Sequence, residues 1–257
     1  MNHKLRSSYP RLRRDSGYTL VEIIVVIIII GILATTAFRS MKGVSDVTRV
    51  EETRQTMDRL AIAIVGDPNC TSEGSRTNYG YVGDVGALPP NLTALVQNPG
   101  GYTTWHGPYV RDLFTTGGAN SSYAQDAWGN AISYSGGTSL SSTGGGSPLT
   151  RSLANSASAI LSNRVSVVVT DLDRNLPGTS FKDSVRFVLT FPNGSGGTTT
   201  RTKNPNRNGL AQFDSIPIGL HSLRVVYTPT NDTVTRYLNV NQGEDTYSEI
   251  SLYRSLW

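Results

Sequence analysis

The sequence predicts an α+β protein: a long N-terminal helix, then a small antiparallel-sheet head, then a C-terminal all-β sandwich with Greek-key connections. Three observations support this prediction. Residues 18–38 are almost entirely apolar, and residues 39–65 contain no proline and repeat apolar side chains every three or four positions. From residue 164 onward, short runs of β-branched and aromatic residues alternate with Gly, Pro, Asn and Asp.

Composition excludes several classes of function. With 26 glycines and only 16% charged residues, the chain has the profile of a loop-rich β protein. Its single cysteine, Cys70, excludes an internal disulfide and multi-cysteine metal sites. The excess positive charge lies in residues 1–17, and the remainder is neutral overall. We therefore expect no nucleic-acid binding, no metal site and no cofactor.

Residues 18–38 read YTLVEIIVVIIIIGILATTAF, with Glu22 as their only charged residue. A helix of this length spans the roughly 30 Å of a bilayer core. The basic residues before it predict that residues 1–17 are cytoplasmic and that the C-terminal bulk crosses the membrane. An isolated carboxylate in such a segment is costly and indicates a partner or a function.

The segment Gly17-Tyr18-Thr19-Leu20-Val21-Glu22 resembles the processing site of type IV prepilins and type II secretion pseudopilins. The resemblance implies that prepilin peptidase removes residues 1–17 as a leader by cutting after Gly17 and methylates the new N-terminus on Tyr18. It also implies that Glu22 is the carboxylate used in assembly. The mature protein would be a single-pass bacterial inner-membrane protein with periplasmic C-terminal domains, which becomes part of an extracytoplasmic filament.

The spacing has a physical rationale. Cleavage creates a positive α-amino group about one helical turn from Glu22. In a low-dielectric medium, the Glu22 of one subunit would attract the N-terminus of an incoming neighbour, which fixes the register of the two helices. The competing interpretations are a secretory signal peptide, whose apolar stretch is normally shorter and uncharged, and a plain single-pass anchor.

The helix is expected to continue from residue 18 to residue 65, where Gly66-Asp67-Pro68 ends it. Its second half is amphipathic, with one apolar face formed by Val44, Val47, Val50, Met57, Leu60, Ala61 and Ile64. Such a helix needs other helices around its first half and a globular domain against its second half.

Residues 66–148 are predicted to form the head. They contain a short helix after Leu88-Pro89-Pro90 with Asn91 as its cap. Two motifs follow, Trp105-His106-Gly107-Pro108-Tyr109 and Asp126-Ala127-Trp128-Gly129-Asn130. Their order resembles the major pseudopilin of type II secretion systems. We expect structural roles for these residues, with Asp126 bonding backbone amides. The calcium site common in that family is not expected, since no carboxylate follows Asp126 before Asp171.

Residues 136–148 are rich in Gly, Ser and Thr and predict a flexible loop or linker, and residues 149–163 predict a linker or a short helix. Residues 164–257 contain six strand-like runs, with a weaker seventh at residues 196–202. The Gly209–His221 segment resembles carboxypeptidase-regulatory-like modules, which are usually non-catalytic. His221 is expected to be structural.

The sequence contains no nucleophile elbow or phosphate-binding loop in the right context, so an enzyme is not expected. The favoured function is a filament subunit of the type II secretion pseudopilin kind. The alternatives are a surface type IV pilin that displays the sandwich for adhesion or motility, and an anchored binding module that does not polymerise. Expected partners are further copies of the chain, the prepilin peptidase, the inner-membrane assembly platform with its minor pseudopilins, and membrane lipid.

Overall fold

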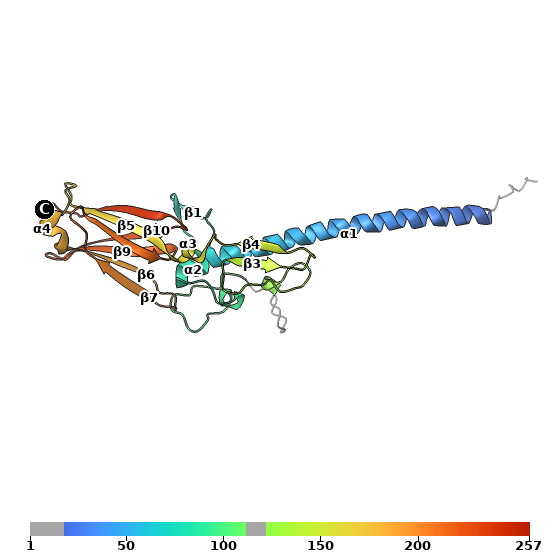
Figure 1. Cartoon of the computed structure of the whole chain (residues 1–257), viewed down its shortest axis with the longest axis horizontal. Coiled ribbons are helices and arrows are strands. Elements are labelled where there is room, and N and C mark those ends of the chain that lie inside the picture. Colours follow the sequence, from blue (N-terminus) through green and yellow to red (C-terminus); the bar gives the residue numbers. More distant parts are fainter. Residues whose placement is uncertain (1–17, 112–121) are drawn as a thin grey trace, which may run out of the picture. The chain divides into compact units, whose positions relative to one another are not determined.

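The computed structural model describes residues 18–111 and 122–257, excluding the side chains of 38–44. It divides into two compact units, residues 1–48 and 49–257, which are considered separately (Figure 1). The predicted leader and Gly17 lie outside the described residues. The α+β class is confirmed: a long apolar helix is followed by short helices, small antiparallel pairs and an all-β sandwich.

The long helix α1 runs from Leu20 to Val65 without interruption, close to the predicted bounds. In the first unit, almost all of its described side chains are exposed, as expected for a segment that would need lipid or other helices around it. In the second unit, α1 buries one face, made of Thr53, Met57, Leu60, Ala61, Ala63 and Ile64.

The predicted apolar face of α1 was too long. Val47 is 70% exposed and belongs to the first unit, and Val50 is only half-buried, so the buried face begins at Thr53. Three- and four-residue spacing reports which side chains share a helix face, but it does not report where the covering domain begins.

The head surrounds the end of α1 with short elements. They are β1 (Thr71–Ser72), β2 (Ser75–Arg76), α2 (Gly80–Val85), η1 (Leu92–Leu95), η2 (Ser122–Ala124), β3 (Ser139–Ser142), β4 (Leu149–Ser152) and α3 (Ala157–Leu161). One core joins the buried face of α1 to these elements and includes Tyr81, Val82, Leu95, Leu140 and Ile160.

The end of the head is more ordered than its predictions describe. The Gly/Ser/Thr-rich segment contains β3, whose Leu140 is fully buried, and β3 pairs with β4 as an antiparallel hairpin. Residues 149–163 contain a short helix, as predicted, but α3 occupies only 157–161 and the strand β4 occupies 149–152. Alternation in this segment was obscured by serine, which is compatible with strands, turns and caps alike.

The sandwich consists of a four-stranded sheet in the order β10-β9-β6-β7 and a three-stranded sheet in the order β11-β5-β8. Its strands are β5 (Asn163–Thr170), β6 (Val185–Pro192), β7 (Thr198–Lys203), β8 (Leu210–Ile216), β9 (Gly219–Tyr227), β10 (Asp232–Val240) and β11 (Asp245–Ser251). The short helices α4 (Gly178–Phe181) and η3 (Lys182–Ser184) connect β5 to β6. All seven predicted strands are present, and β11 pairs with β5 in parallel.

Strict alternation builds the sandwich core. On β6 and β9, every second side chain is buried, including Phe187, Leu189, Leu223 and Val225, and the side chains between them face outward. Both sheets contribute to one hydrophobic cluster, so the sandwich has its own core beside that of the head.

Within the second unit, the head and the sandwich are directly bonded. The Gly194 amide donates to Val85 O at 2.8 Å, the Ile218 amide donates to Ile160 O at 2.9 Å, and the Thr103 amide donates to Gly196 O at 2.8 Å. Ile218 leaves the sandwich core and packs in the head core instead. The sandwich is therefore packed on the head rather than joined to it only by a linker.

Candidate assembly site

The first candidate site is the start of α1, where Tyr18, Thr19 and Glu22 lie. The Tyr18 side chain is 78% exposed. Thr19 immediately precedes the helix; its carbonyl accepts from the Ile23 amide at 3.2 Å, and its Oγ1 accepts from the Glu22 amide at 3.3 Å. Thr19 is thus an N-cap, and Glu22 occupies the third helical position.

The spacing of Thr19 and Glu22 is that of a capping box, and the structure contains its first half, the bond from the Glu22 amide to the Thr19 hydroxyl. The sequence reasoning treated Glu22 only as an assembly carboxylate and missed its place in the cap, although the Thr-x-x-Glu spacing was visible in the sequence. Its position also places a negative charge in the first helical turn, where the helix dipole stabilises it.

Beyond Glu22, α1 presents an apolar surface in every direction. Leu20–Ala37 has a mean hydropathy of 2.8, and its length and composition suffice for one membrane span. Thr35 and Thr36 bond back to the carbonyls of Gly31 and Leu33, which satisfies both hydroxyls within the helix. A polar, capped start followed by a uniformly apolar cylinder suits a helix that packs among other helices.

The second candidate site is the Trp105–Tyr109 motif of the head. The Trp105 indole donates to Ala94 O at 2.9 Å and meets the Tyr109 ring edge-on at 5.7 Å. The Tyr109 hydroxyl donates to Asp84 Oδ2 at 2.7 Å, and its backbone amide donates to Leu95 O. Burial and the Asp84 carboxylate both raise the pKa of Tyr109, so the phenol remains a neutral donor.

Gly107 and Pro108 complete this motif. A Cβ on Gly107 would lie 2.3 Å from the Trp105 ring, so only glycine allows the indole to fold back over the chain. Pro108 follows it at the surface. Asp84 was missed as the partner of Tyr109, because the two residues are distant in sequence and no local pattern links them.

The third candidate site is the turn at Asp126–Asn130. Asp126 is 5% exposed, and its Oδ1 accepts from the Trp128 and Asn130 amides at 2.9 and 2.8 Å. Its Oδ2 accepts from the Ser142 hydroxyl at 2.7 Å. Burial alone would raise the pKa of Asp126, but the bonds from Ser142 and from the two amides outweigh it and hold the pKa below its usual value.

The glycines after Ser142 fit around this turn. A Cβ on Gly144 would lie 2.3 Å from Asp126 Oδ2, and one on Gly145 would lie 2.9 Å from the Trp128 ring. Gly129, with a φ of 83°, occupies the left-handed region that the turn needs. The head motifs thus converge on packing and backbone bonding, with Ser142 as a partner that the sequence did not single out.

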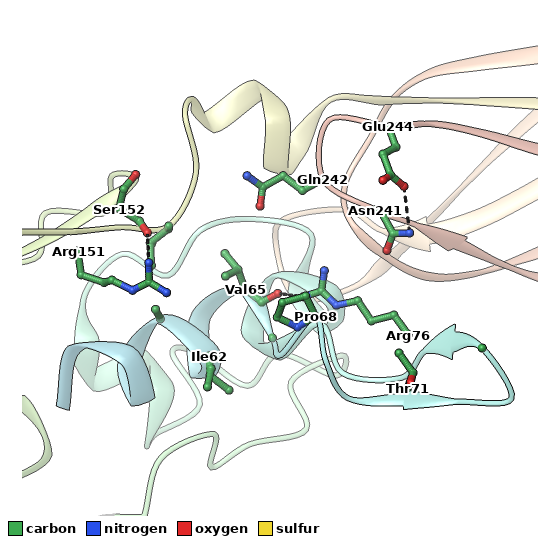
Figure 2. A pocket seen from close by; sticks show the side chains of 14 residues that line it. Ile62, Val65, Pro68, Thr71, Arg76, Arg151, Ser152, Asn241, Gln242 and Glu244 are labelled. Carbon is green, nitrogen blue, oxygen red and sulfur yellow. Dashed lines mark hydrogen bonds between the residues drawn. The ribbon is translucent and has the colours of Figure 1, made fainter. Parts of the chain in front are cut away.

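A cavity lies where the head meets the sandwich, between the end of α1, the β1–β2 hairpin, β4 and the β10–β11 turn (Figure 2). Its charged side chains are engaged with the protein. Arg76 donates to the carbonyls of Val65 and Asn78, and Glu244 accepts from Asn241. Arg151, also drawn in Figure 2, forms an ion pair with Asp58. These contacts indicate a structural role for the charged residues that line this cavity.

No cluster of three or more His, Cys, Asp or Glu side chains suited to a metal ion occurs within residues 18–111 and 122–257. His221 is buried in the sandwich, with Nε2 2.7 Å from Pro217 O. His106 is exposed and lies 3.4 Å from Asp84. The predicted site residues therefore form three separate places: the start of α1, the Trp105 motif and the Asp126 turn.

Comparisons with known proteins bear on the first of these places. A family model described as the prokaryotic N-terminal methylation motif matches residues 12–38, which include Gly17, Tyr18 and Glu22. No curated protein matches the chain. Among solved structures, the crystal structure of S.CueP matches with 14% identity over 45% of this chain and 72% of that chain, at a TM-score of 0.28, too low to carry an argument.

Proposed function

We propose that this chain is a structural subunit of a type IV pilus-like filament, built on a type IV prepilin-like methylation motif and an apolar helix. The observation that carries the proposal is the combination at the start of α1: a match to the methylation motif, a capped start and an apolar surface interrupted only by Glu22. The motif implies processing by a prepilin peptidase, membrane anchoring and assembly.

In this proposal, cleavage after Gly17 exposes the α-amino group of Tyr18, which is then methylated. Removing the leader leaves one cation and one carboxylate at the head of an apolar helix. Leaving either charge unpaired among packed helices is costly, so the Glu22 of one subunit and the N-terminus of its neighbour pair and set the axial register. The apolar surface of residues 20–37 supplies most of the cohesion.

We further propose that the filament is of the type II secretion pseudopilin kind. The Trp105 motif and the Asp126 turn follow the order found in major pseudopilins, and in this chain they build the head around the end of α1. The subunit would then be non-enzymatic and its head periplasmic. Its other partners would be the assembly platform and the minor pseudopilins.

The C-terminal sandwich favours a second candidate, a surface type IV pilin that displays this domain. The resemblance of Gly209–His221 to carboxypeptidase-regulatory-like modules, which are usually non-catalytic, belongs to this alternative. Labelling of the native protein on intact cells separates the two functions: short assemblies confined to the envelope support the secretion piston, and long surface fibres support the pilin.

The proposal is tested by mass spectrometry of the mature N-terminus and by a Glu22→Ala variant. We expect a chain that begins with methylated Tyr18. We also expect Glu22→Ala to be inserted and cleaved but to form few filaments, whereas the matched control Glu52→Ala, an exposed position of the same helix, assembles normally. A mature chain that still begins at Met1, or normal filament yield from Glu22→Ala, would contradict the proposal.

A further inference from the structure

The two outer faces of the sandwich carry opposite charge. On the four-stranded sheet, the outward side chains of β6, β7, β9 and β10 include Arg186 and Arg224, and every position of these four strands is described. Arg186 lies opposite Val226 and Arg224 lies opposite Val188, so the two arginines are diagonal neighbours on adjacent strands. None of the outward positions carries a carboxylate; this surface is called the basic face.

The three-stranded sheet presents the opposite sign. The outward side chains of β5, β8 and β11 include Asp214, Asp245 and Glu249, with Arg164 as the only cation among them. Arg164 is shared by Asp214 at 2.9 Å and Asp245 at 4.0 Å. Arg201 and Lys203 of β7 also reach the β8 edge of this sheet and offset Asp214, so the uncompensated negative charge lies on β11, at Asp245 and Glu249. This surface is called the acidic face.

Other features of both faces suit protein contacts. Each carries one strongly exposed tyrosine, Tyr237 on the basic face (68%) and Tyr247 on the acidic face (64%). Tyrosine is enriched in interfaces, where its ring buries a large area at low entropic cost. Most other outward side chains of the basic face are small and polar, and Thr190 and Thr200 bond across neighbouring strands.

We propose that the basic face of one subunit docks on the acidic face of a second copy of this chain. The two faces have complementary charge, because one carries arginines and the other carries carboxylates. They lie on opposite sheets of the same sandwich. A contact between two different faces is heterologous and propagates along an open polymer instead of closing as a dimer. The inference rests on the proposed filament function.

The area explains why polymerisation must come first. The three-stranded face is the smaller of the two and covers about 350 Å², taking strand spacings of about 4.8 Å and strand lengths of about 24 Å. A standard interface buries about 800 Å² per partner, so this contact is weak for free subunits. Subunits that are already aligned by their helices meet at a high effective concentration, and there a weak contact is formed.

Cross-linking in cells that assemble the full chain tests the docking. In a Cys70→Ser background, Thr235→Cys marks the basic face and Gln212→Cys marks the acidic face; both original side chains are exposed. With a short bis-maleimide, the double variant should give a ladder of covalent multimers. Each single variant should give none, and a mixture of the two singles should give dimers.

Reversing the charge of each face is the second part of this test. Arg186→Glu with Arg224→Glu should reduce the ladder roughly tenfold, because like charges then face each other. Pairing that subunit with one carrying Asp245→Lys and Glu249→Lys should restore cross-linking. The proposal would be overturned by cross-linked dimers from either single variant or by a ladder that charge reversal leaves unchanged. It would also be overturned if Thr235→Cys became cross-linked only to other proteins and never to a second copy of this chain.

The outcome also separates this inference from the filament function. Filaments seen by electron microscopy without any cross-link between the two faces would overturn the docking alone. Absence of both filaments and cross-links would overturn the filament function and the docking that depends on it.

Discussion

At the scale of single residues, a few side chains organise the backbone around them. The Thr19 hydroxyl accepts a hydrogen bond from one of the free amides at the start of α1. The Asp126 carboxylate accepts hydrogen bonds from two amides and a hydroxyl in the head turn. Each of these side chains replaces water as the partner of groups that would otherwise be unsatisfied. Their removal is therefore expected to affect local order more than net charge.

Thr19→Ala should loosen the first turn of α1. Loss of an N-cap costs about 1 kcal/mol, which corresponds to roughly fivefold faster hydrogen exchange at the Glu22 amide. The measurement is amide exchange of the full chain in detergent micelles. Thr19→Ser keeps the hydroxyl and should exchange like the parent chain. Equal exchange in the Ala variant would show that Thr19 does not cap the helix.

Asp126→Ala should destabilise the second unit by about 3 kcal/mol, because the Trp128 amide, the Asn130 amide and the Ser142 hydroxyl lose their acceptor together. Ser142→Ala removes one donor to Asp126 and a long 3.4 Å bond from the Gly144 amide, and should cost about 1 kcal/mol. Denaturant titration of the full chain measures both. Since the folded pKa of Asp126 is lowered, its stabilisation is present above pH about 4 and is lost below it.

At the scale of elements, the sequence was most informative where apolar periodicity was strong. The bounds of α1 and all seven sandwich strands followed from it, because burial on one side forces period 3.6 or period 2. The failures lie where small polar residues dominate. β3 and β4 were hidden among serines and glycines, and the role of Gly144 and Gly145 in packing against Asp126 and Trp128 appears only in three dimensions.

The residues of the candidate sites likewise fall into those that the sequence predicted and those that it did not. Tyr18 and Glu22 belong to a contiguous pattern that the sequence displays in full, and Asp126 was correctly expected to bond backbone amides. Asp84 and Ser142 were not found, because each meets its partner through contacts between distant segments. The cap by Thr19 was readable from spacing but was overlooked beside the charge of Glu22.

The strand β8 shows how an exposed sheet edge is covered. Arg201 and Lys203 of β7 donate to the carbonyls of Asp214 and Gln212, which β8 would otherwise present for pairing with another chain. Their charged heads also lie over the rings of Phe191 and Phe213. Two side chains of the four-stranded sheet thus bond to the exposed edge of the three-stranded sheet.

Replacing both cations, Arg201→Ala with Lys203→Ala, should raise aggregation of the full chain while changing its melting temperature only slightly, because both side chains are largely exposed. Light scattering during incubation below the melting temperature measures this. The control Arg186→Ala with Arg224→Ala removes two cations from the basic face and should leave the β8 edge covered. Equal aggregation of the two double variants would refute edge protection.

At the scale of the whole described second unit, the sandwich and the head are expected to respond together. Their junction is made of backbone bonds and close approaches at glycines: a Cβ on Gly86 would lie 2.4 Å from Pro192 O, and one on Gly196 would lie 2.2 Å from the Tyr102 ring. Glycine at both positions also has a positive φ. A junction this close transmits a disturbance of one part to the other.

His221 provides a test of this coupling. It lies on β9 beside Gly219, where an added Cβ would lie 2.7 Å from the His221 ring and 3.3 Å from Gly83 O of the head. Its Nε2 pairs with Pro217 O, and its buried Nδ1 has no partner within the described residues. Burial lowers the pKa of His221, and the bond to Pro217 opposes this only in part.

The sign of the pH dependence follows from that lowered pKa. The unfolded chain binds a proton at His221 near pH 6.5, whereas the folded chain resists protonation, so stability is full above pH about 6.5 and falls as the pH drops below it. Protonation would add an unpaired Nδ1–H to a buried ring. His221→Gln should flatten this part of the profile, while Asp126→Asn should leave it unchanged. Thermal melts of the full chain carrying Trp257→Phe, which removes the tryptophan packed on the sandwich, provide the measurement, followed by the fluorescence of the head tryptophans Trp105 and Trp128. If the fall occurs in near-ultraviolet signals of the sandwich but not at these tryptophans, the head and the sandwich unfold independently and the coupling through their junction is refuted.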